Sequence, residues 1–166
     1  MTTDIIPAAP EAVALELGNR GILSEEPFEG LDTVQRRSSD RLSHLLGRAL
    51  FGGYFLYNGI NHFKRHDMLS GYAGSKGVPA PRVAVAISGA MLLAGGASLL
   101  TGYRPRLGAA LIAGFLLGVS PVMHAFWKEA DAQARTNESV NFLKNAGLLG
   151  GTLLAASHPE PWPVSL

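Results

Sequence analysis

Three groups of polar side chains in this chain could do chemistry together. The groups are Asn58, Asn61 and His62; Ser120 and His124; and Glu138, Asn141 and Asn145. Within each group the residues are spaced so that a helix would carry them on one face, because residues three or four apart are neighbours on a helical surface. The spacing predicts three polar stripes on three separate helices.

Two interpretations of these stripes remain open. Polar side chains at membrane depth are costly unless they are paired, so the stripes form either a hydrogen-bond network or the lining of a ligand pocket. A quinone head group needs donors for its two carbonyl oxygens and a protonatable neighbour, and His62, His124 and Asn141 could supply them. Imidazole and carboxylate groups also bind zinc or iron, but the spacing matches no recognised ligand motif, so we predict no metal.

Long uncharged segments would position these stripes. Val83–Thr101 and Leu107–His124 contain no charged residue, which is rare in soluble folds. We therefore predict an all-α integral membrane protein, a four-helix bundle with a polar N-terminal extension. The predicted spans are about 45–63, 82–100, 107–127 and 140–157. The second and third form an antiparallel hairpin, and Pro121 kinks the third.

The segment 1–41 differs from the rest of the chain. It is rich in Pro and Gly and holds eight of the 13 acidic residues. We expect a polar acidic tail that is disordered or binds a partner, with a short helix over Glu11–Leu17. The four-helix domain then covers 42–158, and 159–166 form a short C-terminal tail.

The amino-acid composition argues against several classes of function. The chain has no cysteine, so it has no disulfide, no thiol redox centre and no iron–sulfur cluster. Its net charge is +1 and no extended basic stripe interleaves with aromatic residues, which argues against nucleic-acid binding. We expect no intrinsic cofactor, with quinone or lipid as the ligands that suit the chain.

Lysine and arginine do not orient the bundle, because each side would carry seven of the 14. Exporting the charged tail without a signal sequence is the harder route, so we predict both termini in the cytoplasm. Antiparallel threading would then bring the three polar stripes together at the outer end of the bundle. We also expect close packing at small residues, including Gly118 and Gly147.

The stretch from Leu46 to Leu154 resembles the DoxX family of four-helix membrane proteins. The similarity is carried by short elements along that stretch. They are Gly47–Arg48, Asn58–Gly59, Gly77–Pro79, Ser88–Gly89, Gly95–Gly96, Met123–His124, Phe126–Trp127, Phe142–Asn145 and Gly150–Gly151. The resemblance implies a multi-pass protein of the bacterial inner membrane, associated with redox or sulfur metabolism, including quinone-linked thiosulfate oxidation in some members. It implies no agreed catalytic residues, and the acidic tail lies outside the usual family core.

Three functions follow as hypotheses. The first is a noncatalytic accessory or anchoring subunit of a larger redox or respiratory membrane complex, docked partly through residues 1–41. The second is a quinone- or small-molecule-binding subunit of an oxidoreductase such as thiosulfate:quinone oxidoreductase. The third is a transporter, although inverted repeats are not seen. Whether the protein is an enzyme stays open, and a role without catalysis of its own is favoured.

Overall fold

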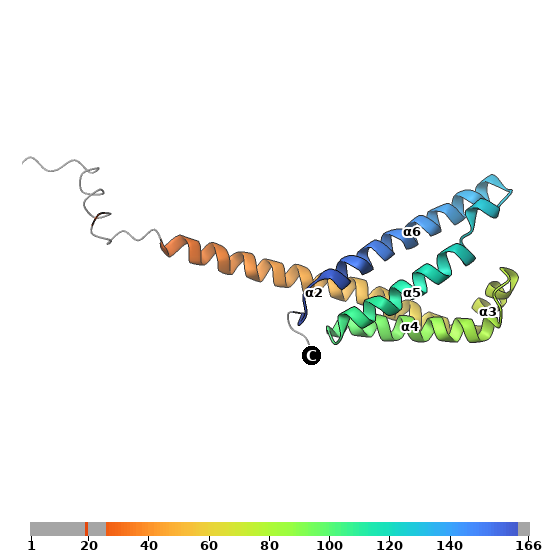
Figure 1. The fold of residues 1–166 in the computed structure, drawn as a ribbon, viewed down its shortest axis with the longest axis horizontal. Coiled ribbons are helices and arrows are strands. Elements are labelled where there is room, and N and C mark those ends of the chain that lie inside the picture. The colour runs from red at the N-terminus through yellow and green to blue at the C-terminus, as the bar shows by residue number, and fades with distance from the viewer. Residues whose placement is uncertain (1–18, 20–25, 163–166) are drawn as a thin grey trace, which may run out of the picture. The chain divides into compact units, whose positions relative to one another are not determined.

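The computed structural model describes residue 19 and residues 26–162, and this part of the chain is helical without a strand (Figure 1). The helices are α2 (Glu26–Lys64), α3 (His66–Ser75), α4 (Pro81–Thr101), α5 (Pro105–Met123), the 3₁₀ turn η1 (Phe126–Lys128) and α6 (Ala132–Ser157). The chain divides into two compact units, Met1–Leu42 and Ser43–Leu166. The all-α prediction is confirmed for the described residues.

The first unit is described only at residue 19 and over 26–42. Residues 26–42 are the beginning of α2, whereas the sequence was expected to be loop or a segment that orders on a partner up to residue 41; binding of a partner there stays a prediction. The residues before Leu45 are polar, but they include no proline between 28 and 42 that would end a helix. The predicted helix over Glu11–Leu17 lies outside the described residues.

Helices α4 and α5 form the predicted hairpin. Gly102 ends α4 in the left-handed conformation, and Arg104 takes the same conformation just before Pro105 starts α5. The Ser98 hydroxyl lies 2.7 Å from the carbonyl oxygen of Tyr103, which holds this tight turn. Both helices begin with proline, the residue whose fixed φ suits a first helical position.

Apolarity is unevenly distributed among the four predicted spans. In the described part of the chain, Pro81–Thr101 and Pro105–Lys128 are long and apolar enough to cross a membrane. The segment of α2 that was expected to span carries Asn58, Asn61 and His62, and α6 carries Lys144, so both are less apolar.

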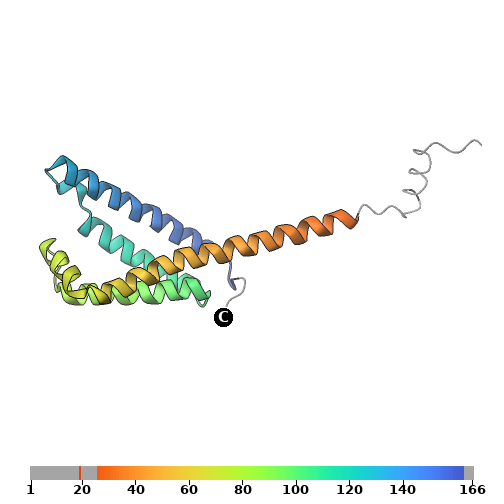
Figure 2. The same cartoon turned by 180° about the vertical axis from the view of Figure 1, so that it is seen from behind.

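Glycines set the distance between α2 and α4 in the second unit (Figure 2). A Cβ built on Gly96 would lie 2.6 Å from the backbone nitrogen of Leu56, and one on Gly52 would lie 2.8 Å from that of Leu100. The two backbones can approach this closely only without side chains. The expected close packing at Gly118 and Gly147 is wrong, since a Cβ there would meet nothing within 4 Å.

Three boundaries differ from the predictions. Helix α5 ends at Met123, so Pro121 lies in its last turn and does not kink a longer helix. Helix α6 starts eight residues before the predicted span because the Asp131 carboxylate caps it, accepting from the Ala134 amide at 2.8 Å. Helix α3 was not predicted at all.

The core joins α2, α4, α5 and α6. Phe55, Leu92, Leu99, Ile112 and Leu116 are its largest fully buried apolar side chains. Close packing of these side chains holds the four helices together. This core fixes the helices whose polar residues form the candidate site.

Candidate ligand-binding site

Four of the eight predicted site residues line one cavity. Asn58, His62, His124 and Asn145 surround a space of about 160 Å³, which we name the polar cavity. These residues come from α2, from the end of α5 and from α6, as helical spacing predicted. The rest of the wall consists of Lys144 and mostly apolar residues of α2, α4, α5 and α6, including Leu92 and Phe115.

His62 presents a defined face to this cavity. Its Nδ1 lies 2.8 Å from the backbone oxygen of Asn58, one turn earlier in α2. A carbonyl oxygen only accepts hydrogen bonds, so Nδ1 carries the proton. In a neutral imidazole the other nitrogen, Nε2, is then an acceptor. The His62 ring also packs edge-on against Phe115, with ring centroids 5.9 Å apart.

His124 links the polar cavity to a group of charged residues. Its Nδ1 lies 2.8 Å from Glu138 Oε2, and the two side chains are 20% and 14% exposed. The other Glu138 oxygen lies 3.4 Å from Lys76 Nζ and from the Tyr72 hydroxyl. Lys76 also bonds Glu129 at 3.2 Å. We name these five residues the end cluster.

The contacts within the end cluster favour the ionised carboxylate of Glu138 and the protonated amine of Lys76. The hydrogen bond from His124 lowers the pKa of Glu138 despite an opposing effect of burial, and the charge of Lys76 adds to the lowering. The hydrogen bond to Glu129 raises the pKa of Lys76. Burial, followed by the charge of Glu138, raises the pKa of Tyr72, so its hydroxyl stays a donor. Glu138 is thereby held as an anion beside His124.

A second, larger space adjoins the polar cavity. It measures about 350 Å³, and we name it the side cavity. The two spaces share His62, Phe115 and Val119 in their walls. Most of its lining is aliphatic or glycine from α4 and α5, with the polar groups of Tyr72 and Ser88 added. A small polar chamber beside a mostly apolar one is a common arrangement in ligand sites.

The remaining predicted residues lie elsewhere. Ser120 donates to the backbone oxygen of Leu116 at 2.6 Å and lines a separate space of about 250 Å³, whose wall includes Asn145. Asn141 accepts from Lys144 at 3.0 Å. Asn61 lines none of these cavities. The eight residues therefore do not form one continuous group.

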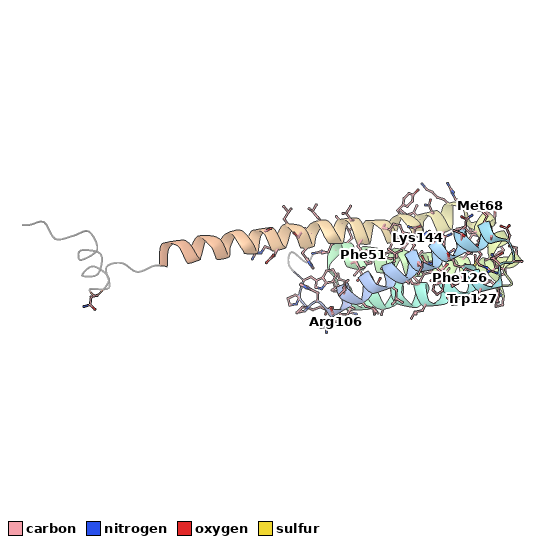
Figure 3. All side chains as sticks on the ribbon, turned by 90° about the horizontal axis from the view of Figure 1, so that it is seen from above. Phe51, Met68, Arg106, Phe126, Trp127 and Lys144 are labelled. Carbon is pink, nitrogen blue, oxygen red and sulfur yellow. The ribbon has the colours of Figure 1, made fainter. Side chains whose placement is uncertain are left out.

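Aromatic side chains flank the site on the η1 side. Phe126, Trp127 and Phe142 pack edge to face, with ring centroids 5.1–5.8 Å apart. Figure 3 shows Phe126 and Trp127 at the end of the helices opposite Arg106. Among the side chains that the structure describes, no three His, Asp or Glu residues gather in a group that could hold a metal ion.

The fold is helical over the described residues, and two of its helices are long and apolar enough to cross a membrane. Residues 43–125, half of the chain, match the model of the DoxX family, so the protein belongs to that family. The match includes His62 and His124 and ends before α6, which contributes Glu138 and Asn145. No curated protein and no solved structure matches the chain.

Proposed function

We propose that this DoxX protein crosses the bacterial inner membrane four times and binds a quinone-type molecule as an accessory subunit of a membrane redox complex. Both termini lie in the cytoplasm in this proposal. The observation that carries it is that a polar cavity and a mostly apolar one share His62, Phe115 and Val119 in their walls. A quinone has the same two parts, a polar ring and an apolar tail.

Membrane insertion is supported by the apolarity and packing of the helices. Helices α4 and α5 have the length and composition of spans. Residues 43–64 of α2 and the α6 helix pack against this pair and carry exposed large side chains such as Tyr57 and Leu154, at 63% and 75% exposure. In a bilayer such side chains would face lipid.

The polar groups suit both redox forms of a quinone. His62 Nε2, as an acceptor, can receive a hydrogen bond from a quinol hydroxyl and take its proton. The amide of Asn145 and the ammonium of Lys144, both in the cavity wall, can donate to a quinone carbonyl. The side cavity, at about 350 Å³, falls within the range of about 300–1,000 Å³ common for small-molecule sites.

The accessory role is proposed because electron transfer needs a redox group, and the chain has no cysteine to provide one. A chain without cysteine cannot hold an iron–sulfur cluster or cycle a dithiol. Electrons for a quinone bound at His62 would therefore come from another protein or from a cofactor. The chain itself would bind the ring, orient it and handle a proton.

Titration of a short-tailed ubiquinone analogue into the purified protein in lipid nanodiscs tests this proposal. Gly118 lines the side cavity, and a Cβ there meets nothing within 4 Å, so the side chain of Gly118→Leu should extend into this space. We expect this variant to bind about tenfold more weakly, a loss of about 1.4 kcal/mol. Gly147→Leu is the matched control, because a Cβ there is equally unobstructed and Gly147 lines none of these cavities. Absence of saturable binding to the unmodified protein, or equal affinity of Gly118→Leu, would contradict the proposal.

A further inference from the structure

A fourth cavity, larger than the three described above, lies at the other end of the helices from the end cluster. It measures about 640 Å³ and is formed by residues 43–54 of α2, the end of α4 and the last turns of α6 with the residues that follow. We name it the histidine cavity. Neither the predicted site residues nor the quinone proposal uses it.

One wall of the histidine cavity is basic and aromatic. His44 stacks on His158 with ring centroids 4.7 Å apart, and Trp162 packs edge-on against His44 at 5.0 Å. The Arg48 guanidinium lies 5.6 Å from the Trp162 ring centroid. Among the described residues that line this cavity there is no Asp or Glu. The wall therefore carries positive charge and two further groups that can become positive.

Arg48 is fixed in this wall. It is 6% exposed, and its Nε and Nη2 donate to the backbone oxygens of Leu99 and Leu100 at 3.2 and 2.9 Å. Those carbonyls lie at the C-terminal end of α4, where the helix dipole favours a cation. These two hydrogen bonds hold the guanidinium in place, so its positive charge stays in the cavity wall.

His44 has unused hydrogen-bonding capacity. Its Nε2 is buried and has no hydrogen-bond partner. Burial, followed by the charges of His158 and Arg48, lowers the pKa of His44, so the surroundings disfavour its cation. An anion placed in the cavity would reverse this effect, because a negative charge nearby favours the protonated imidazole.

Most of the remaining lining of the cavity is apolar. Leu50, Phe51 and Leu154 line it, and Leu50 and Leu154 are 76% and 75% exposed. In the proposed membrane topology these two leucines face the hydrocarbon region, while His44 and His158 lie at the level of the head groups. The cavity thus combines a basic interfacial end with an apolar groove directed toward the bilayer.

We propose that the histidine cavity binds an anionic phospholipid of the surrounding bilayer, with the phosphate at His44, Arg48 and His158 and an acyl chain along Leu50 and Leu154. Charge complementarity favours this occupant, since basic pockets between membrane helices commonly take acidic head groups. Trp162 suits the same position, because tryptophan is enriched at the boundary between head groups and hydrocarbon. The inference relies on the proposed membrane insertion but not on quinone binding.

Native mass spectrometry of the full-length protein, with phosphatidylglycerol or phosphatidylcholine added at equal concentration, tests the assignment. We expect phosphatidylglycerol to be retained about tenfold more strongly. Gly47 lines the cavity and a Cβ there meets nothing within 4 Å, so Gly47→Leu should fill it and abolish the preference. Gly53→Leu is the control on the same helix, with an equally open Cβ position outside this cavity, and should keep it.

A second variant, His158→Leu, and a second ligand, inorganic phosphate, test whether the histidine cavity prefers an anionic lipid. His158→Leu retains the cavity wall but removes an imidazole, and it should reduce the lipid preference. Phosphatidylglycerol should raise the unfolding temperature, whereas inorganic phosphate should not; stabilisation by phosphate alone would overturn the lipid assignment. Equal retention of the two lipids by the unmodified protein would also overturn it. Gly47→Leu should bind the ubiquinone analogue normally, so failure of the lipid site is distinguishable from failure of the quinone proposal.

Discussion

Replacing Glu138 by glutamine should weaken the attachment of α6 to the end cluster. The carboxylate accepts from His124 at 2.8 Å and lies 3.4 Å from both Lys76 and Tyr72, with 14% of its side chain exposed. Hydrogen bonds to a charged group contribute about 1.5–3 kcal/mol when they are shielded from water. Glutamine keeps the shape and one acceptor oxygen, so we expect Glu138→Gln to lower the free energy of unfolding by about 1–2 kcal/mol at pH 7.

The pH dependence of this loss has a definite sign. Folding lowers the pKa of Glu138 from the unfolded value of about 4.3. Its contribution is therefore fully present above the unfolded pKa and is lost as the pH falls through the folded pKa. The difference in stability between the unmodified protein and Glu138→Gln should be larger at pH 7 than at acidic pH, and it should shrink as the pH falls through the lowered folded pKa of Glu138.

Unfolding in mixed detergent micelles, followed by circular dichroism at pH 7 and at acidic pH, measures the difference. Asp67→Asn serves as the control, because Asp67 pairs with Arg82 while 83% and 70% of the two side chains are exposed. Exposed pairs contribute little, so this variant should unfold like the unmodified protein. Equal stability of Glu138→Gln at pH 7, or a difference that grows on acidification, would refute the reasoning.

Three further predictions concern packing, topology and partners. Gly96→Ala should destabilise by about 1–3 kcal/mol, because its Cβ would lie 2.6 Å from backbone, whereas Gly53→Ala in open space should be neutral or slightly stabilising in the same unfolding assay. Single cysteines at Thr2 and Ser75 should label from opposite sides of intact cells; labelling from one side would exclude the proposed topology. Deleting residues 2–25, which leaves α2 whole, should remove co-purifying proteins and leave the helices inserted; an unchanged set of proteins would exclude a partner at this segment.

The bounds of α4 and the start of α5 were predictable to within two residues. Long uncharged runs are bounded there by Pro81, Gly102 and Pro105, whose backbone preferences set where helices start and stop. Helix α3 has no such signal, since its sequence contains several glycine and serine residues that favour turns as readily as helix. The early start of α6 was signalled by Asp131, a common capping residue.

Helical spacing located the part of the site that lies on long helices. Asn58 and His62 share one stripe and do line a common cavity with His124 and Asn145. Tyr72, Lys76 and Glu129 were missed, because they meet their partners across 53 to 66 residues of sequence and stand on a short helix and a loop. Local periodicity carries no information about contacts of that kind. The same limitation hid the histidine cavity, which joins two helix ends far apart in the chain.

Photoaffinity labelling with an azido-quinone in native membranes, followed by peptide mapping, tests the central proposal most directly. The label should attach to residues in the walls around His62, which lie within 54–73 of α2 and α3, 84–92 of α4, 114–124 at the end of α5 and 144–148 of α6, and excess unlabelled quinone should prevent it. Gly118→Leu should lose the label at those positions while Gly147→Leu keeps it. Labelling confined to other segments, or labelling that excess quinone does not reduce, would contradict a quinone site at His62.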